Sequence, residues 1–210
     1  MNNKIDSIIF DLDGTLWDAA DTVAKAWKAA KEKVDFEIQE ITPEIIRSIA
    51  GTQHNLIYGM LFPHLSPGQQ KELMEVSGKE EMAHIKKYGG KLYEGLEETL
   101  EYLRDKQYKL FIVSNCQDGY IEAFLEHHRL QPYFQDHECS GRTGLPKDEN
   151  LKAIISRNNL EAPIYVGDTQ GDCDAAAKAD VPFFYARYGY REVEQYEHSL
   201  DKISDLTTIF

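Results

Sequence analysis

Short apolar runs alternate with amphipathic segments along this sequence, and this alternation limits the possible folds more than any other feature. The runs are of strand length and rich in β-branched and aromatic residues: Ile5–Phe10, Lys109–Val113, Pro163–Val166 and Val181–Tyr185. Helical patterns are expected between and beside them, at Leu96–Lys106, Asp118–His128, Asp148–Asn158 and Asp172–Ala179. Such alternation is typical of a parallel sheet with helices on both faces. We therefore predict an α/β protein with a Rossmann-like parallel-sheet core, and a ligand site beyond the carboxyl ends of its strands.

The interval between the first and second strands is too long for one crossover. It spans about 100 residues, whereas a βαβ unit needs only about 30. Residues 21–34 and 67–88 place apolar side chains at three- and four-residue spacing, which indicates amphipathic helices. We predict an inserted helical cap domain over residues 17–90, with residues 1–16 and 91–210 forming the core.

Charge and composition exclude several classes of protein. The chain has 36 acidic and 23 basic residues and a formal net charge of -13, so nucleic acid and anionic membrane surfaces are poor partners. It contains no apolar run of about 18 residues, so no membrane-spanning helix is expected. The three cysteines lack a pattern, and the N-terminal segment has no signal-peptide character. These features predict a cytoplasmic protein, and they leave its oligomeric state open.

Two aspartates follow the first strand directly, in the stretch FDLDGTLWD that begins at Phe10. Two carboxylates held this close repel each other, and their burial is costly unless a cation compensates them. A cation is therefore expected beside Asp11 and Asp13. The alternative is a pair of loop or helix-capping aspartates, but a cap does not need two acids against an isoleucine-rich strand.

Further polar groups stand at the ends of later strands. Ser114 has a hydroxyl that can bind phosphoryl oxygens, or it can cap the following helix. Lys147 can supply the local cation, or it is a surface lysine near the start of a helix. Asp168 and Asp172 offer hard oxygen ligands with no nearby histidine, which favours Mg²⁺ over zinc or copper.

Four of these stretches occur in a characteristic order: DLDGT, VSN, LPK and GDTQGDCDAA, at residues 11–15, 113–115, 145–147 and 167–176. Together they resemble the four motifs of the haloacid dehalogenase superfamily, whose members are mostly phosphohydrolases. The helical insertion resembles the cap of phosphoglycolate phosphatase-like members. The resemblance implies a haloacid dehalogenase fold and Mg²⁺-dependent hydrolysis of a small phosphorylated metabolite through an aspartyl-phosphate.

The resemblance also assigns roles to individual residues. Asp11 would be the nucleophile, Asp13 the general acid and base, and Ser114 and Lys147 the remaining catalytic groups. The phosphoryl group is expected to contact Thr15 and Asn115 in addition to Ser114 and Lys147. The expected Mg²⁺ ligands are Asp11, the backbone carbonyl of Asp13, Asp168 and Asp172.

Substrate selection is expected to depend on the cap. The segment Ile45–Asn55 is predicted to be a loop that faces the core, with Arg47, Thr52, Gln53 and His54 as candidate substrate contacts. Trp17 either lines the entrance or packs against the hinge. Phosphoglycolate, sugar phosphates, nucleotides and pyrophosphate all stay open as substrates.

Four alternative functions stand beside the hydrolase. Dehalogenases of the superfamily lack the second acid of the first motif, so Asp13 argues against that reaction. Phosphomutases that resemble this chain use a cap histidine where Val23 stands here. A phosphotransferase would share every core motif, and a non-catalytic binding protein is disfavoured because the core acids and Lys147 are all present.

Overall fold

A six-stranded parallel sheet forms the centre of the protein, in a computed structural model that describes residues 5–210. The strands lie in the order β5-β4-β1-β6-β7-β8, and every neighbouring pair is parallel. Their bounds are β1 Ser7–Phe10, β4 Lys109–Ser114, β5 Phe134–Cys139, β6 Pro163–Gly167, β7 Phe183–Ala186 and β8 His198–Leu200. Counted along the chain, these six strands run 3-2-1-4-5-6, so the order reverses between β1 and β6. This arrangement confirms the predicted α/β, Rossmann-like core.

Alternate residues of each strand enter two separate hydrophobic clusters, because successive side chains of a strand point to opposite faces. Ile8 and Phe10 pack in one cluster, and Ile9 packs in the other. The first face is covered by α5 Leu96–Asp105, α6 Tyr120–His128 and α10 Leu206–Ile209, and the second by α8 Lys147–Arg157 and α9 Gln170–Lys178. The central strands are therefore buried on both sides, which explains their continuous apolar runs.

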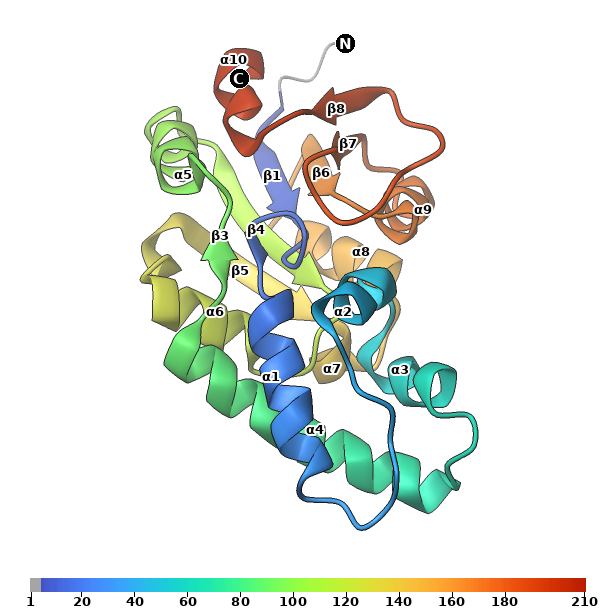
Figure 1. The fold of residues 1–210 in the computed structure, drawn as a ribbon. Helices are drawn as coiled ribbons and strands as arrows, with labels where there is room; N and C mark the ends of the chain where they lie inside the picture. The colour runs from blue at the N-terminus through green and yellow to red at the C-terminus, as the bar shows by residue number, and fades with distance from the viewer. Residues whose placement is uncertain (1–4) are drawn as a thin grey trace.

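Four further helices form a layer beyond the carboxyl ends of the strands, in the lower half of Figure 1. They are α1 Ala20–Lys31, α2 Pro43–Ile49, α3 His54–Leu61 and α4 Pro67–Tyr88. The two connections to the core pair with each other, since β2 Trp17–Asp18 lies antiparallel to β3 Lys91–Leu92. We call α1–α4 the helical layer; the boundaries predicted for a cap domain at residues 17 and 90 stay a prediction.

The sequence patterns missed the edges of the sheet. β5 reads FQDHEC and is mostly half-buried, so it carries no apolar run. β8 has three residues, of which Leu200 alone is buried. Short turns of helix also went unpredicted: η1 Gln131–Tyr133, α7 Ser140–Thr143 and η2 Ile203–Asp205. Within residues 5–210, no helix has the length and apolar character that a membrane span requires.

Candidate active site

The aspartates of the first and last motifs meet where the strand order reverses. Asp11 follows β1, and Asp168 follows the neighbouring β6. The backbone N–H of Asp11 donates to the carbonyl of Val166 at 2.8 Å, which continues the ladder past the end of β1. The chain then turns at Gly14, whose φ is 85°, and a Cβ there would overlap the Asp168 carboxylate. Glycine is thus required both by the turn and by the close approach of the two loops.

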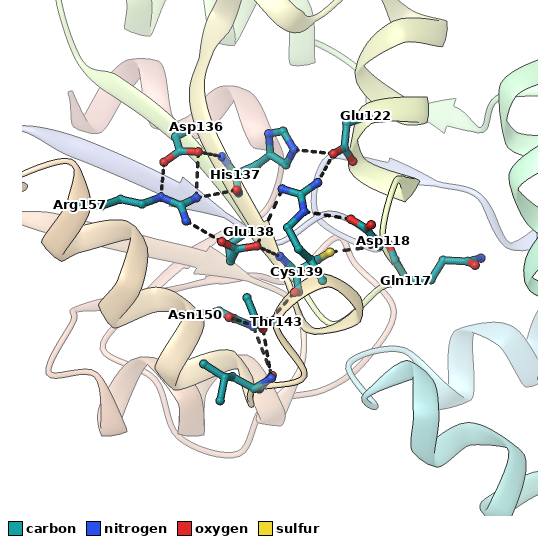
Figure 2. Close-up of polar contacts among 12 residues, drawn as sticks. Gln117, Asp118, Glu122, Asp136, His137, Glu138, Cys139, Thr143, Asn150 and Arg157 are labelled. Atoms are coloured by element: carbon teal, nitrogen blue, oxygen red, sulfur yellow. Dashed lines mark hydrogen bonds and ion pairs between the residues drawn. The ribbon is translucent and has the colours of Figure 1, made fainter.

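Lys147 connects the carboxylates. Its Nζ lies 2.8 Å from Oδ1 of Asp11 and 2.5 Å from Oδ1 of Asp172, and its side chain is 4% exposed. The lysine is the first residue of α8, and Asn150, three residues further along this helix, holds the loop that leads into it. Asn150 donates to the carbonyl of Leu145 and accepts from the hydroxyl of Thr143 (Figure 2). The loop that delivers Lys147 is therefore tied to the helix that follows it.

An outer network of ion pairs supports the same region (Figure 2). Arg157, the last residue of α8, forms two hydrogen bonds to Asp136 on β5 and one to Glu138, with N–O distances of 2.6 to 2.9 Å. Arg142 contacts Asp118 and Glu122 at the start of α6. The Arg157 pairs fix α8 against β5, the Arg142 pairs fix α7 against the start of α6, and both sets lie outside the pocket that Lys147 enters.

Burial and mutual repulsion perturb the acids of the site. Burial, together with the nearby charge of Asp172, raises the pKa of Asp11 to about 7, against the opposing effect of Lys147. Burial and the two neighbouring carboxylates also raise the pKa of Asp168 well above its usual range. For Asp172 burial again acts to raise the pKa, but Lys147 and the hydrogen bonds from Thr169 outweigh it and hold the pKa low. Asp172 is thus the fixed anion of the group.

The three acids fit a hard divalent cation. Asp11, Asp168 and Asp172 each place a carboxylate oxygen within 4.8 Å of the others, and all three are buried. One lysine faces three carboxylates, so the group has an excess of negative charge and oxygen donors, which suits Mg²⁺. Asp172 is the least available of them, because its oxygens accept from Lys147, Tyr165 and Thr169. We assign it mainly to holding Lys147.

Asp13 has different surroundings from Asp11. Its Oδ1 accepts from the indole Nε1 of Trp17 at 3.0 Å and from the hydroxyl of Tyr120 at 3.2 Å. Burial raises the pKa of Asp13 to about 6, although both hydrogen bonds act to lower it. Trp17 is fully buried and packs edge-on against Phe124, so of its two predicted roles the structure shows the packing one. It positions Asp13 and does not line the pocket.

The three hydroxyl and amide groups expected at the phosphoryl group differ in availability. Ser114 lines the pocket, and its Oγ accepts from the backbone N–H of Cys116. Asn115 also lines the pocket, but its amide bridges the carbonyl of Gly51 and the hydroxyl of Ser140. Thr15 is fully buried and donates to Asp168, so its side chain orients a carboxylate.

The candidate contacts from the helical layer divide into two pairs. Thr52 and His54 line the pocket. Arg47 is paired with Asp18 at 2.8 Å, and Gln53 donates to the carbonyl of Leu145, so neither of these side chains lines it. The prediction of one loop over Ile45–Asn55 is wrong, because α2 extends to Ile49 and α3 starts at His54. The Thr42 cap and Pro43 favour the start of α2, so the first part of this segment is helical.

The pocket itself has a volume of about 720 Å³, part of it open to solvent, and lies between the strand ends and the helical layer. Sequence reasoning missed Trp27, Glu81, Gln117, Tyr120 and Tyr190, which all line it. The sequence did contain one signal for Glu81. Leu73, Ser77, Glu81 and Ile85 recur every four residues along α4, and all are buried, so an acid stands on the apolar stripe of an amphipathic helix.

Comparison with known proteins agrees with this geometry. The model of the haloacid dehalogenase-like hydrolase family matches residues 8–186. The chain belongs to this family.

Its curated relatives include a phosphoglycolate phosphatase from Aliivibrio fischeri, 29% identical over 98% of this chain and 94% of that protein. A pyrophosphatase from Listeria welshimeri is 27% identical over 100% of this chain and 98% of its own length. Among solved structures, a haloacid dehalogenase-like family protein from Streptococcus pneumoniae superimposes with a TM-score of 0.83 at 20% identity, covering 98% of both chains. CbbY from Rhodobacter sphaeroides, solved in complex with phosphate, gives a TM-score of 0.80 at 16% identity over 97% of this chain and 96% of that chain. These likenesses extend over the helical layer as well as the sheet.

Proposed function

We propose that this protein is a Mg²⁺-dependent phosphate monoester hydrolase that acts on a small phosphorylated metabolite. The observation that carries the proposal is the contrast between Asp11 and Asp13, two carboxyls in one pocket with different partners. Asp11 is held by a lysine, and Asp13 is held by a tyrosine and a tryptophan. Two titratable groups whose surroundings separate their behaviour are the usual basis of an acid and a nucleophile in one site. The relative named as a phosphoglycolate phosphatase supports the same reaction.

Asp11 has the geometry of the nucleophile. Lys147 donates to Oδ1, and no hydrogen bond from the described residues reaches Oδ2. In the first step Oδ2 attacks phosphorus, an aspartyl-phosphate forms, and the bond from phosphorus to the ester oxygen breaks. Lys147 stays beside the reacting carboxylate and offsets the negative charge that gathers on the phosphoryl oxygens.

Asp13 acts as the general acid and the general base. In its acid form it transfers a proton to the departing alkoxide, and as a carboxylate it then takes a proton from the water that attacks phosphorus. A pKa of about 6 keeps both forms accessible near neutral pH. Trp17 and Tyr120 hold Oδ1, so the second oxygen of Asp13 is the one that serves the reaction.

Asp11, the carbonyl of Asp13, and Asp168 would hold Mg²⁺, with Asp172 beside them. When bound, the ion would neutralise charge on the phosphoryl oxygens and on the crowded carboxylates. Ser114 would bind a phosphoryl oxygen from the other side of the pocket.

One residue of the helical layer favours a hydrolase over a mutase. Val23 lines the pocket at the position where the resembling mutases carry a histidine, and its side chain cannot move a proton. A phosphotransferase would use the same core residues and differ in the acceptor alone.

An aryl phosphate tests this proposal, with and without Mg²⁺, when released phenol and released phosphate are both measured. Equal, Mg²⁺-dependent release of the two products supports the hydrolase. If phenol exceeds phosphate once a simple alcohol is added, the enzyme transfers the phosphoryl group to that alcohol. If the folded protein with Mg²⁺ releases neither product from this or any alkyl phosphate, the proposed reaction is wrong.

A further inference from the structure

Glu81 is a buried acid that the reaction described above does not use. It lies on α4 and lines the pocket from the side of the helical layer, and it is 6% exposed. Its Oε1 accepts from the indole Nε1 of Trp27 at 2.6 Å, and its Oε2 accepts from the side-chain amide of Gln117 at 2.7 Å. Both donors are neutral, and each carboxylate oxygen retains room for a second hydrogen bond. A buried carboxylate without a cation is costly to keep in a fold.

The rest of the pocket does not compensate this acid. Among the described residues that line it, Lys147 is the sole lysine or arginine, and its ammonium is engaged by Asp11 and Asp172. His54 is neutral, because burial lowers its pKa to about 4. The nearby Arg47 is directed to Asp18, and Arg191 to the backbone carbonyl of Ser48.

A leaving group that ends in a carboxylate or a second phosphate would therefore meet no available cation on this side. It would instead lie beside Glu81, where two negative charges in a desolvated site repel each other. The pocket is not built for the anionic terminus of phosphoglycolate.

The part of the pocket wall beside Glu81 is suited to a ligand group that donates a hydrogen bond. Trp27 stacks on Tyr58 and Phe62, with ring centroids 5.6 and 5.8 Å apart, so its indole is held rigidly beside Glu81. Val23, Ile46 and Ile49 add apolar side chains to the lining of the same pocket. A carboxylate next to an indole in an apolar setting is a favourable environment for an ammonium group, and it also accepts from a hydroxyl.

We propose that Glu81 binds the leaving group of the substrate, and that the pocket selects phosphate esters whose alcohol part presents an N–H or O–H donor, an ammonium above all, over esters that end in an anion. This inference rests on the proposed hydrolase function. It also separates this chain from the substrate that its phosphoglycolate phosphatase relatives are named for.

Four phosphate esters of two-carbon alcohols test the proposal: 2-aminoethyl phosphate, 2-hydroxyethyl phosphate, ethyl phosphate and phosphoglycolate, which end in an ammonium, a hydroxyl, a methyl and a carboxylate group respectively. At pH 8, where Glu81 is ionised, we expect kcat/KM of the wild type to be about tenfold or more higher for the amine than for phosphoglycolate, mainly through KM. Glu81→Gln should reduce that ratio by about tenfold, because it removes the charge and keeps the size of the side chain. Glu75→Gln is the matched control: it removes the same charge from an exposed position of the same helix, and it should leave the ratio unchanged.

The outcomes distinguish a failure of the Glu81 proposal from a failure of the proposed hydrolase function. An amine preferred over the hydroxyl ester indicates an ion pair with Glu81, and equal use of the two indicates a neutral hydrogen bond; both support the proposal. Phosphoglycolate hydrolysed as well as the amine by the wild type overturns it, as does a Glu81→Gln ratio equal to that of the wild type. The wild-type comparison holds even if the variant fails to fold. Absence of hydrolysis of all four esters and of an aryl phosphate is a failure of the proposed function itself.

Discussion

The two sides of the pocket treat charge in opposite ways. On the sheet side, Asp11 and Asp172 share one buried lysine, and each of these groups follows from a motif. On the helical side, Glu81 is buried with two neutral donors in an apolar wall. In the proposed function, the sheet side binds the phosphoryl group, whose chemistry is the same in every substrate. The helical side binds the organic part, which differs between substrates. On this proposal, different elements of the fold carry the reaction and the choice of substrate.

Replacement of the nucleophile should have the largest effect. In Asp11→Asn the amide cannot form the aspartyl-phosphate, so we expect kcat on any ester to fall by at least about 10⁴-fold. Steady-state release of phosphate measures this loss. Asp35→Asn, at an exposed position of the chain, is the control and should keep full activity. Activity that survives in Asp11→Asn after contamination is excluded would contradict the assignment.

Lys147→Met should damage both folding and activity. It leaves Asp11 and Asp172 buried without their cation, and breaking a buried pair in this way costs about 3–5 kcal/mol. We expect urea unfolding to show that loss together with strongly reduced kcat. Lys152→Met, which removes an exposed lysine of the same helix paired with Glu149 and Asp148, should leave the unfolding free energy close to that of the wild type. Equal losses in the two variants would show that Lys147 is not the compensating charge.

Asp13→Asn should discriminate between leaving groups. An alkyl ester needs a proton on its departing oxygen, so we expect kcat to fall by about 10²–10⁴-fold. A nitrophenyl ester leaves without that proton, and its first step should be far less affected. The burst of nitrophenol in the first turnover measures that step. A first step slowed equally for both esters would indicate that Asp13 does not act as the acid.

The sequence motifs identified the groups on the sheet side of the pocket but not Glu81 on the helical side, and the reason is physical. Asp11, Ser114 and Asp168 stand at strand ends, and parallel strands bring their carboxyl ends together whatever the length of chain between them. Glu81 reaches the same pocket only because α4 packs on α1 and α6 at one particular rotation. A single-sequence pattern indicates that an acid lies on the apolar stripe of that helix, but not that Trp27 and Gln117 meet it.

Sequence reasoning also placed Arg47 at the substrate because it is a cation in a segment expected to be a loop. The structure pairs it with Asp18 instead. Short-range pairing of this kind depends on where two connections cross, which a motif does not record. Strand β5 was missed for a related reason, since an edge strand held by ion pairs needs no apolar run.

The pH dependence of stability should single out Glu81. Burial raises its pKa from 4.5 to about 7, and the nearby Asp13 charge adds to the effect. Between these two values the folded protein keeps a proton that the unfolded chain releases, so this contribution to stability is present at low pH and is lost as pH rises toward 7. Glu81→Gln has no such proton to lose. We therefore expect its unfolding free energy, relative to wild type, to rise by up to about 3 kcal/mol between pH 4.5 and 8.

Chemical denaturation of the two proteins across that range measures this difference. Asp13 is present in both, so its own titration largely cancels. Glu75→Gln should track the wild type at every pH, because its side chain is exposed. A wild-type minus Glu81→Gln difference that does not vary with pH would mean that Glu81 is not an uncompensated buried acid.

The smallest effect is expected outside the pocket, in the ion pairs of Figure 2. Arg157→Ala removes the partner of Asp136 and one donor to the buried Glu138, but the arginine side chain is 42% exposed, and water replaces much of what is lost. We expect the unfolding free energy to fall by about 1 kcal/mol, with kcat and the ester ratios unchanged, because Asn150 and Thr143 still hold the loop before Lys147. A large loss of kcat in this variant would show that the ion pairs on β5 position Lys147. In that case Arg157, at the far end of α8, would contribute to the reaction as well as to the stability of the fold.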